Sequence, residues 1–244
     1  MGANLLFPIV SGESGRFAAC FLRQYGFQLT DHPSPDITHL LLDVPGSPSD
    51  TVELKELLRR LPKNITVIGG NLELDFFQNY KKMDLLKDPL FLAKNAAITA
   101  ECALQAAAPY LTTTFADTPV LILGWGRIGK CLGKLLSVIG CPVTIAARKD
   151  GDRALAEAMG HRAVDFSTLE HEISRHKLLF NTVPDGIVSD KQFEGCILMD
   201  LASAPGLKGR HIITARGLPG KYAPESAGRL IAESICRLDK EVIT

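Results

Sequence analysis

Residues 119–130 read PVLILGWGRIGK, and this stretch decides the fold of the chain. The apolar run VLIL predicts a buried strand that ends directly in a glycine motif formed by Gly124, Gly126 and Gly129. Gly124 permits a tight turn off the strand, Gly126 lets a pyrophosphate approach the backbone, and Gly129 lets the next helix lie close to the sheet. Because the N-terminus of that helix offers unpaired N–H groups to phosphate, the stretch predicts a dinucleotide site.

The sequence on either side of the motif separates it from an ordinary glycine turn, which is the structural alternative. Residues 128–139 predict an amphipathic helix and residues 142–147 a second strand, so the motif lies in a strand–helix–strand unit of about 30 residues. We therefore expect the nucleotide to contact the motif itself. Its residues are Gly124, Trp125, Gly126, Arg127, Ile128 and Gly129.

The end of the second strand predicts which nucleotide binds. A site for NAD usually carries Asp or Glu about 20 residues after the glycine motif, where the carboxylate holds the ribose 2′-hydroxyl. Here the strand ends in Arg148 and Lys149 instead, and a guanidinium suits the 2′-phosphate of NADP. We therefore expect NADP rather than NAD, while two solvated surface cations are the alternative that leaves NAD open.

Composition and charge argue against several other classes of protein. The 244 residues carry 27 Lys and Arg against 27 Asp and Glu, so the net charge of zero argues against nucleic acid or an anionic membrane surface as a partner. No apolar stretch reaches the roughly 18 residues of a membrane span, and the N-terminus lacks the basic start of a signal peptide. The six cysteines form no CxxC pair, and no cluster has the spacing of metal ligands. We expect a cytoplasmic chain with reduced thiols and no metal.

Strand and helix patterns alternate along the chain, which predicts an α/β protein. We expect a Rossmann domain with a doubly wound parallel sheet over residues 94–224, preceded by a smaller, flavodoxin-like α/β domain over residues 1–93. An amphipathic closing helix over residues 225–240 is expected to return to the first domain. The alanine-rich residues 95–111 predict a helix that bridges the domains, whereas the lysine-rich part of residues 72–92 is typical of solvated surface.

Polar residues and a glycine turn follow the later strands of the Rossmann domain, where the riboses and the nicotinamide pass in this fold. We expect cofactor contacts at these strand ends, with loop punctuation or helix capping as the structural alternative. The turn GLPG at residues 217–220 would close over the nicotinamide, since a glycine backbone allows close approach. The candidates are Asn181, Thr182, Val183, Pro184, Asp200, Ser203, Leu218 and Pro219.

Five stretches carry a family resemblance, namely GWGRIG at 124–129, VTIAARK at 143–149, FNTVP at 180–184, MDLASAPG at 199–206 and GLPGKYAPESAG at 217–228. In order and wording they resemble the A subunit of dipicolinate synthase. The resemblance covers residues 94–234 and is only architectural over residues 1–90. It departs from the family at Cys102, where a glycine is expected, and in a short segment between Pro205 and Gly217, which we expect to lack a helix.

The resemblance implies a cytoplasmic protein of spore-forming bacteria. Together with a flavoprotein-like B subunit, such a protein converts a dihydro- or tetrahydrodipicolinate precursor to dipicolinate with a nicotinamide cofactor. Two other functions stay open: a non-catalytic NAD(P)-binding regulatory subunit, and an enzyme like the D-2-hydroxyacid dehydrogenases. We also expect a homo-oligomer.

A substrate with two carboxylates needs cations or helix N-termini in its site. The bridging helix and the GLPGKYAPESAG stretch hold polar residues that suit it, and we expect the small dicarboxylate to bind between them. Glu101 and Lys221 are the catalytic candidates, although a carboxylate on a lone helix is more often solvated surface. The substrate candidates are Asn95, Thr99, Glu101, Gly220, Lys221 and Ser226.

Overall fold

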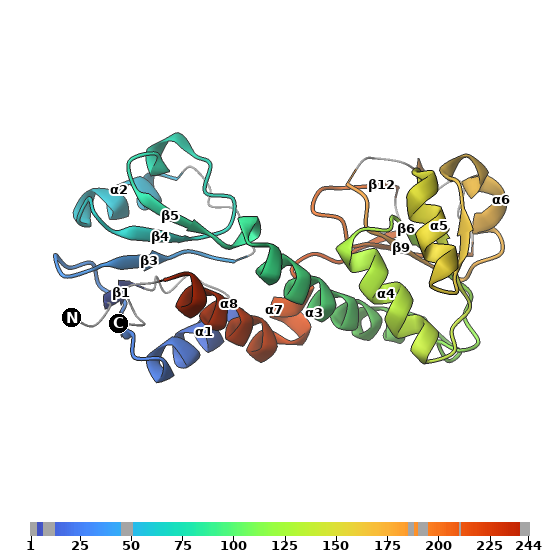
Figure 1. The fold of residues 1–244 in the computed structure, drawn as a ribbon, viewed down its shortest axis with the longest axis horizontal. Helices are drawn as coiled ribbons and strands as arrows, with labels where there is room; N and C mark the ends of the chain where they lie inside the picture. Colours follow the sequence, from blue (N-terminus) through green and yellow to red (C-terminus); the bar gives the residue numbers. More distant parts are fainter. Residues whose placement is uncertain are drawn as a thin grey trace. The chain divides into compact units, whose positions relative to one another are not determined.

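The computed structural model describes residues 4–6, 13–44, 51–184, 188–189, 195–209 and 211–239. The chain divides into two compact units, of which one joins Met1–Asn95 to Pro219–Thr244 and the other is Ala96–Leu218 (Figure 1). The first boundary falls inside the long helix α3 (Pro89–Ala107) and the second inside the short helix α7 (Leu218–Tyr222). The sequence places the corresponding boundaries at residues 93 and 224.

The first unit is built on a five-stranded parallel sheet with the order β2-β1-β3-β4-β5, which is the order of flavodoxin-like folds. The strands are β1 (Asn4–Leu6), β2 (Gln28–Thr30), β3 (His39–Leu41), β4 (Thr66–Gly69) and β5 (Lys81–Asp84). Its helices are α1 (Glu13–Gln24), α2 (Val52–Arg60), the 3₁₀ helices η1 (Asp75–Phe77) and η2 (Leu85–Lys87), and α8 (Pro224–Leu238).

Helix α8 packs along α1 at very short range. A Cβ on Gly228 would lie 2.5 Å from the Phe17 Cβ and 2.6 Å from the Ala18 amide nitrogen, so only glycine allows this crossing. Just beyond the end of α8, Asp239 lies 2.9 Å from His39 Nε2 in β3, and both side chains are 2% exposed. The closing helix is therefore fixed to its unit at a glycine near its start and by a buried contact between the Asp239 carboxylate and the His39 ring at its end.

Strand β5 falls within residues 72–92, where the sequence indicates solvated surface and predicts no strand. The segment pairs in parallel with β4 at the edge of the sheet, with Lys81 opposite Thr66. Lys81 and Lys82 are exposed. Charged residues blunt an edge strand against further pairing, and they also remove the apolar alternation from which a strand is predicted.

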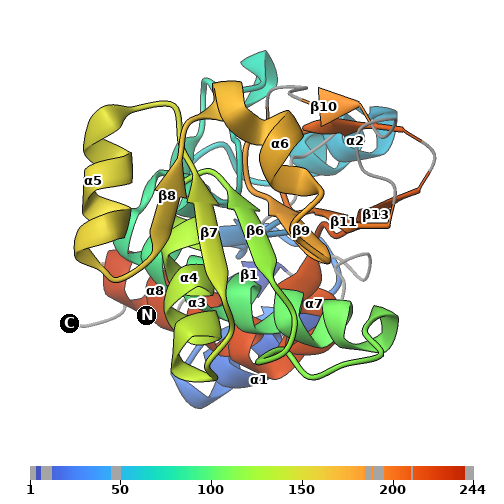
Figure 2. The ribbon, with the colours of Figure 1, turned by 90° about the vertical axis from the view of Figure 1, so that its right-hand side faces the viewer.

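The second unit contains a six-stranded parallel sheet with the order β13-β11-β9-β6-β7-β8, the order of a Rossmann fold (Figure 2). The strands are β6 (Val120–Leu123), β7 (Val143–Ala146), β8 (Arg162–Val164), β9 (Leu178–Asn181), β11 (Ile197–Asp200) and β13 (Ile212–Thr214), with a separate pair β10 (Val188–Ser189) and β12 (Leu207–Lys208). The helices are η3 (Ala108–Tyr110), α4 (Arg127–Val138), α5 (Asp150–Ala158), η4 (Phe166–Thr168) and α6 (Leu169–Ile173). The predicted doubly wound fold is confirmed.

The core of this unit explains why its central strands β6 and β9 are almost continuously apolar. All four residues of β6 are fully buried, as are all four of β9. Helix α4 packs against β6 and β7, and α5 packs against β7 and β8. One cluster, which includes Leu121, Leu123, Leu169, Leu179 and Leu198, joins strands β6, β9 and β11, among others, to α6. A parallel sheet covered on both faces produces such continuous apolar runs.

Several predicted element boundaries shift in the structure. The bridging helix begins at Pro89 rather than at residue 95, and it ends at Ala107 before continuing as η3. Helix α1 already begins at Glu13, where the sequence indicates a loop over residues 12–15. The expected turn GLPG is wrong, because Leu218 begins α7 and only Gly217, with a φ of +62°, keeps a turn conformation. A first strand is expected over residues 5–10, but residues 7–12 lie outside the described part of the chain.

His176 connects α6 to the sheet of the second unit. Its Nδ1 lies 2.6 Å from the Glu172 carbonyl oxygen, and its Nε2 lies 2.9 Å from the Thr144 hydroxyl. A carbonyl only accepts, so Nδ1 carries the proton, and in the neutral ring Nε2 accepts from the Thr144 hydroxyl. Burial lowers the pKa of His176 below its ordinary value.

This neutral histidine predicts that the second unit loses stability in mild acid. The folded pKa lies below the unfolded pKa of about 6.5, so the contribution is complete above that pH and is lost as pH falls through the folded pKa. Urea unfolding followed by the fluorescence of Trp125, the chain's one tryptophan, is expected to show a midpoint that falls between pH 7 and pH 5. His176→Gln should flatten this dependence, whereas His171→Gln, at an exposed position, should leave it unchanged. Equal pH dependence in all three proteins would contradict the assignment.

Candidate nucleotide site

The carboxyl ends of β6, β7 and β9 meet at one edge of the sheet, and three hydrogen bonds tie them together. The Gly124 amide donates to the Ala146 carbonyl at 2.9 Å. The amide and the hydroxyl of Thr182 both donate to the Leu123 carbonyl, at 3.0 and 2.8 Å. The strand order reverses at this edge, because β6 lies between β7 and β9. In doubly wound folds, ligands bind at such a switch point.

The three glycines of the motif are required for different reasons. Gly124 has a φ of +96°, and a Cβ there would lie 2.6 Å from Thr182 Oγ1. A Cβ on Gly129 would lie 2.2 Å from the Gly124 carbonyl oxygen, so α4 can begin this close to the strand only with glycine. A Cβ on Gly126 meets no atom of the described residues within 4 Å. Packing within the protein therefore explains Gly124 and Gly129, while Gly126 borders open space.

The other side chains of the motif differ in exposure. Trp125 is 4% exposed, and its ring packs against Gly133 and edge-on against His161, with ring centroids 5.3 Å apart. Arg127 is exposed and Ile128 is half-buried. Trp125 therefore fills space against α4 and leaves only its backbone to a ligand, whereas Arg127 places a cation in the first turn of that helix.

The two predicted cations, Arg148 and Lys149, are exposed on the loop that follows β7. The Arg148 guanidinium lies over the Phe166 ring, 5.4 Å from its centroid. Arg153 holds the loop in place, because its Nη1 donates to the Arg148 carbonyl at 2.9 Å and to Asp165 Oδ2 at 2.6 Å. The loop backbone is thus fixed by one arginine, and the two cations next to it are presented at the surface.

Asn181 and Asp200 form a buried pair at the ends of β9 and β11, and both are at most 2% exposed. Asn181 Nδ2 donates to Asp200 Oδ1 at 2.8 Å and to the Val183 carbonyl at 2.9 Å. Asp200 also accepts from the amides of Ala202 and Gly206, at 3.3 and 2.9 Å. These polar atoms are occupied by the protein, so the pair positions the loops after both strands, while direct contact with a cofactor stays a prediction.

Sequence reasoning did not single out Arg153 or Gly206, and both fix loops of this site. A Cβ on Gly206 would lie 2.1 Å from the Val183 carbonyl oxygen, so glycine is needed where the two loops touch. The sequence points to them only indirectly. Arg153 is an arginine in the first turns of a predicted helix, and Gly206 ends the MDLASAPG stretch. Among the predicted loop residues, Thr182 and Val183 are half-buried, and Pro184 and Ser203 are exposed.

The predicted substrate residues are divided between the two units, and each is described within its own unit. In the second unit, Thr99 is buried and Glu101 is exposed on α3. In the first unit, Asn95 is half-buried on α3, and Lys221 and Ser226 are exposed on α7 and α8. The Gly220 position lies against α1, where a Cβ would be 3.5 Å from Ser14 Oγ, and Leu218 and Pro219 beside it are buried. The substrate site stays a prediction.

The two departures from the family have simple structural counterparts. Cys102 is fully buried on α3, and burial raises the pKa of its thiol, as expected for a core packing residue rather than a reactive one. Between β11 and β13, the described residues 201–209 and 211 contain the short strand β12 and no helix. The expected loss of a helix in this connection agrees with that part of the chain.

The described residues contain neither a cluster of metal ligands nor a helix that could span a membrane. No group of three or more His, Cys, Asp or Glu side chains in that part of the chain is arranged to hold a metal ion. Its helices are also either too short or too polar to cross a membrane.

No model of a known protein family matches the chain. The A subunit of dipicolinate synthase from Bacillus subtilis (strain 168) is 26% identical over 215 residues, which cover 80% of this chain and 72% of that protein. The crystal structure of the same subunit from Bacillus halodurans has a TM-score of 0.81 at 20% identity, with 97% of both chains covered. The crystal structure of the Bacillus subtilis protein has a TM-score of 0.79 at 20% identity, covering 100% of this chain and 97% of that one. The chain is therefore similar in sequence and in fold to the dipicolinate synthase A subunits. The resemblance drawn from the sequence motifs is confirmed.

The buried pair predicts a strong dependence of this unit on Asp200. Asp200→Ala removes one of the hydrogen bonds that the Asn181 amide donates and leaves the buried backbone amides of Ala202 and Gly206 without their acceptor, and each unpaired group costs about 1–3 kcal/mol. We expect urea unfolding to report a loss of about 3 kcal/mol or more. Ser203→Ala, on the same loop but exposed, should change stability by less than about 0.5 kcal/mol. Similar small losses in both variants would show that the pair does not hold the loops.

Proposed function

We propose that the chain is an NAD(P)-dependent oxidoreductase subunit that acts on a dihydro- or tetrahydrodipicolinate precursor, in partnership with a flavoprotein-like B subunit. The observation that carries the nucleotide part is Gly126. Protein packing demands the other two glycines of the motif, but at Gly126 the missing side chain leaves open space at the N-terminus of a 12-residue helix. A pyrophosphate is the group that such a backbone accommodates.

Residues around the switch point suit the parts of a dinucleotide. Backbone amides of the motif residues 124–129 hold the pyrophosphate, with Arg127 as an added cation in the first turn of α4. Arg148 and Lys149 hold a 2′-phosphate, which makes NADP the expected nucleotide. The loops after β9 and β11, with Thr182 and Ser203, contact the remainder of the molecule. When bound, an oxidised nicotinamide supplies a hydride acceptor.

The substrate part of the proposal rests on the relationship to the A subunit of dipicolinate synthase. Oxidising a dihydrodipicolinate ring to the aromatic pyridine removes one hydride and one proton, and a tetrahydro ring needs this twice. The protein must then orient two carboxylates and accept a proton. Glu101 is proposed as the proton acceptor and Lys221 as a carboxylate anchor, with Asn95, Thr99, Gly220 and Ser226 as further substrate contacts.

One experiment tests the proposed reaction. Purified chain is mixed with NADP⁺ and freshly generated dihydrodipicolinate, and absorbance at the NADPH band is followed with and without the B subunit of a relative. We expect NADPH to form with dipicolinate in equal amount. Nucleotide binding without any turnover, even with the B subunit, would favour a regulatory subunit. Turnover of a 2-hydroxy acid instead would favour an enzyme of the D-2-hydroxyacid dehydrogenase type.

The open space at Gly126 predicts a selective loss of nucleotide binding. Gly126→Val places a branched side chain where the pyrophosphate would lie, so NADPH affinity should fall about a hundredfold or more with no change in the circular dichroism spectrum. Gly151→Val is the matched control, because Gly151 on α5 also borders open space. Calorimetric titration with NADPH decides the matter. Unchanged affinity in Gly126→Val would place the phosphates elsewhere.

The cations after β7 predict the choice between the two nucleotides. Arg148→Ala removes a charge-assisted bond to the 2′-phosphate, so the dissociation constant for NADPH should rise roughly tenfold while that for NADH changes little. Lys134→Ala, at an exposed cation on α4, controls for the general loss of positive charge. Equal losses for both nucleotides would remove Arg148 as the discriminating residue and leave NAD as the cofactor to consider.

A further inference from the structure

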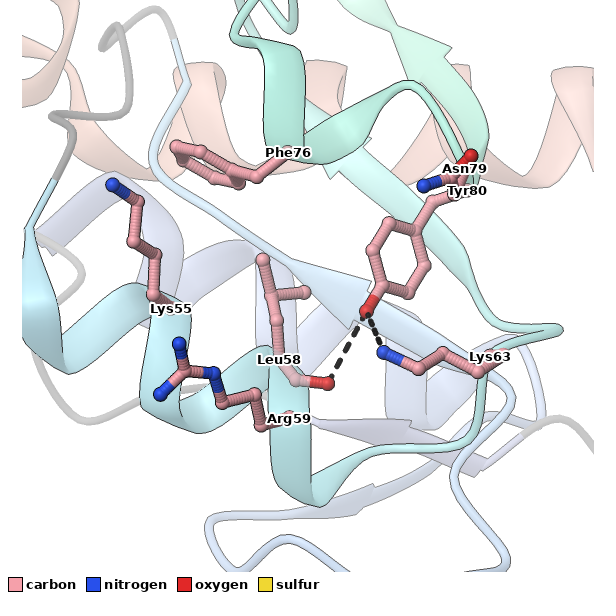
Figure 3. Close-up of a pocket in the computed structure, with 7 residues that line it drawn as sticks. All are labelled: Lys55, Leu58, Arg59, Lys63, Phe76, Asn79 and Tyr80. Atoms are coloured by element: carbon pink, nitrogen blue, oxygen red, sulfur yellow. Dashed lines mark hydrogen bonds between the residues drawn. The ribbon is translucent and has the colours of Figure 1, made fainter.

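A basic hollow lies in the first unit, away from the glycine motif in the sequence. Its volume is about 500 Å³, and it opens between α2 and the segment around η1 (Figure 3). The cations in its lining are Lys55, Arg59 and Lys63, and its apolar walls are Leu58 and the rings of Phe76 and Tyr80. None of these residues belongs to the candidate nucleotide or substrate site, so the proposed function leaves the hollow without a role.

Hydrogen bonds and cation–ring contacts hold the walls of the hollow in place. Tyr80 is 9% exposed, and its hydroxyl donates to the Leu58 carbonyl at 3.2 Å, which ties the η1 segment to α2. Lys63 Nζ donates to the same hydroxyl at 3.4 Å and lies 5.6 Å from the Tyr80 ring centroid. Lys55 Nζ lies 5.6 Å from the centroid of the Phe76 ring. Two rings and the cations beside them are therefore held in one arrangement (Figure 3).

The charge of the hollow is uneven. Its lining contains three cations and no carboxylate. Glu73 and Asp75 line an adjoining hollow that shares Lys55 and Phe76, so they offset positive charge mainly on that side. Arg59 and Lys63 are both exposed, and they stand on the α2 side of the hollow (Figure 3). A carboxylate entering the hollow therefore meets its most favourable field between these two residues.

We propose that this hollow is a second ligand site for a flat aromatic ring that carries two carboxylates. The aromatic and aliphatic walls bury the ring, and Arg59 and Lys63 donate charge-assisted hydrogen bonds to the carboxylates. The volume lies in the range of small-molecule sites, about 300–1,000 Å³. A ligand without a ring, such as inorganic phosphate, would use the cations and leave the apolar walls uncovered.

Dipicolinate belongs to this ligand class, and its role here rests on the proposed function. As the product of that reaction, it would occupy the hollow as a site separate from the one where it is made. The hollow would then let the protein respond to the amount of product. The site itself does not depend on that role, since it is argued from the walls and charges of the first unit alone.

The test uses the full chain and dipicolinate itself as the probe. Calorimetry gives the affinity, and heteronuclear NMR gives the location through the side-chain amide of Asn79, which also lines the hollow. Glutarate is the matched ligand, because its carboxylates are joined through the same number of atoms without a ring. Arg59→Gln/Lys63→Gln is compared with Arg60→Gln, a neighbouring exposed arginine outside the lining.

We expect dipicolinate to shift the Asn79 amide signals, glutarate to bind at least tenfold more weakly, and the double variant to lose about tenfold or more of the affinity at this site. Arg60→Gln should bind like the unmodified chain. Arg59→Gln alone, which changes only an exposed side chain, should show part of the loss. Equal binding of glutarate, or unchanged Asn79 signals, would overturn the proposal. Turnover of dihydrodipicolinate is measured on the same proteins. Binding at the hollow without turnover would support this site and contradict the proposed reaction, and turnover without binding at the hollow would do the reverse.

Discussion

The close approach of backbone to backbone at the end of β6 is the constraint on which the second unit depends. The Gly124 carbonyl lies so near Gly129 that no side chain fits at Gly129, and Thr182, which donates to the Leu123 carbonyl, leaves no room for a side chain at Gly124. Helix α4 can therefore start directly at the switch point of the sheet, with its first amides facing outward. If Gly129 had a side chain, the helix would have to move away from the strand end, and the open space beside Gly126 would no longer adjoin its N-terminus.

Around this joint the site separates groups that hold the loops from groups that face a ligand. Asn181 and Asp200 are buried and fully engaged with each other and with loop amides, which is the condition under which a buried polar pair gives rigidity rather than a penalty. Arg153 likewise fixes the loop after β7, through hydrogen bonds to the Arg148 carbonyl and to Asp165. The exposed Arg148 and Lys149 can then be offered to a phosphate on a backbone that other residues already fix.

The sequence predicts well those parts of the fold where a local residue pattern is compatible with only one structure. Strand β6 and helix α4 follow from an apolar run and a glycine spacing that few other structures produce. The sequence does not predict edge strand β5, because its lysines suit an exposed edge and its residues show no apolar alternation. The role of Gly206 depends on the separate loop after β9, and that of Arg153 on the fold of the loop just before its own helix, and no local sequence pattern records either. Helix α7 replaces the turn expected from GLPG, since Pro219 fits the first turn of a helix as well as it fits a loop.

The two units differ in whether a carboxylate of the protein pairs with the backbone amides at a strand end. After β4 of the first unit, Asp84 accepts hydrogen bonds from the amides of Asn71, Leu72 and Leu86, at 3.2, 3.1 and 3.0 Å. A protein carboxylate thus occupies amides at that strand end, and an anionic ligand there would meet a negative charge. In the second unit, α4 begins at Gly126, which has no side chain to cap the helix, and the space beside it is open. The N-terminus of α4 thus has no side-chain cap of the kind that Asp84 provides in the first unit, and this supports the proposal of a phosphate at α4.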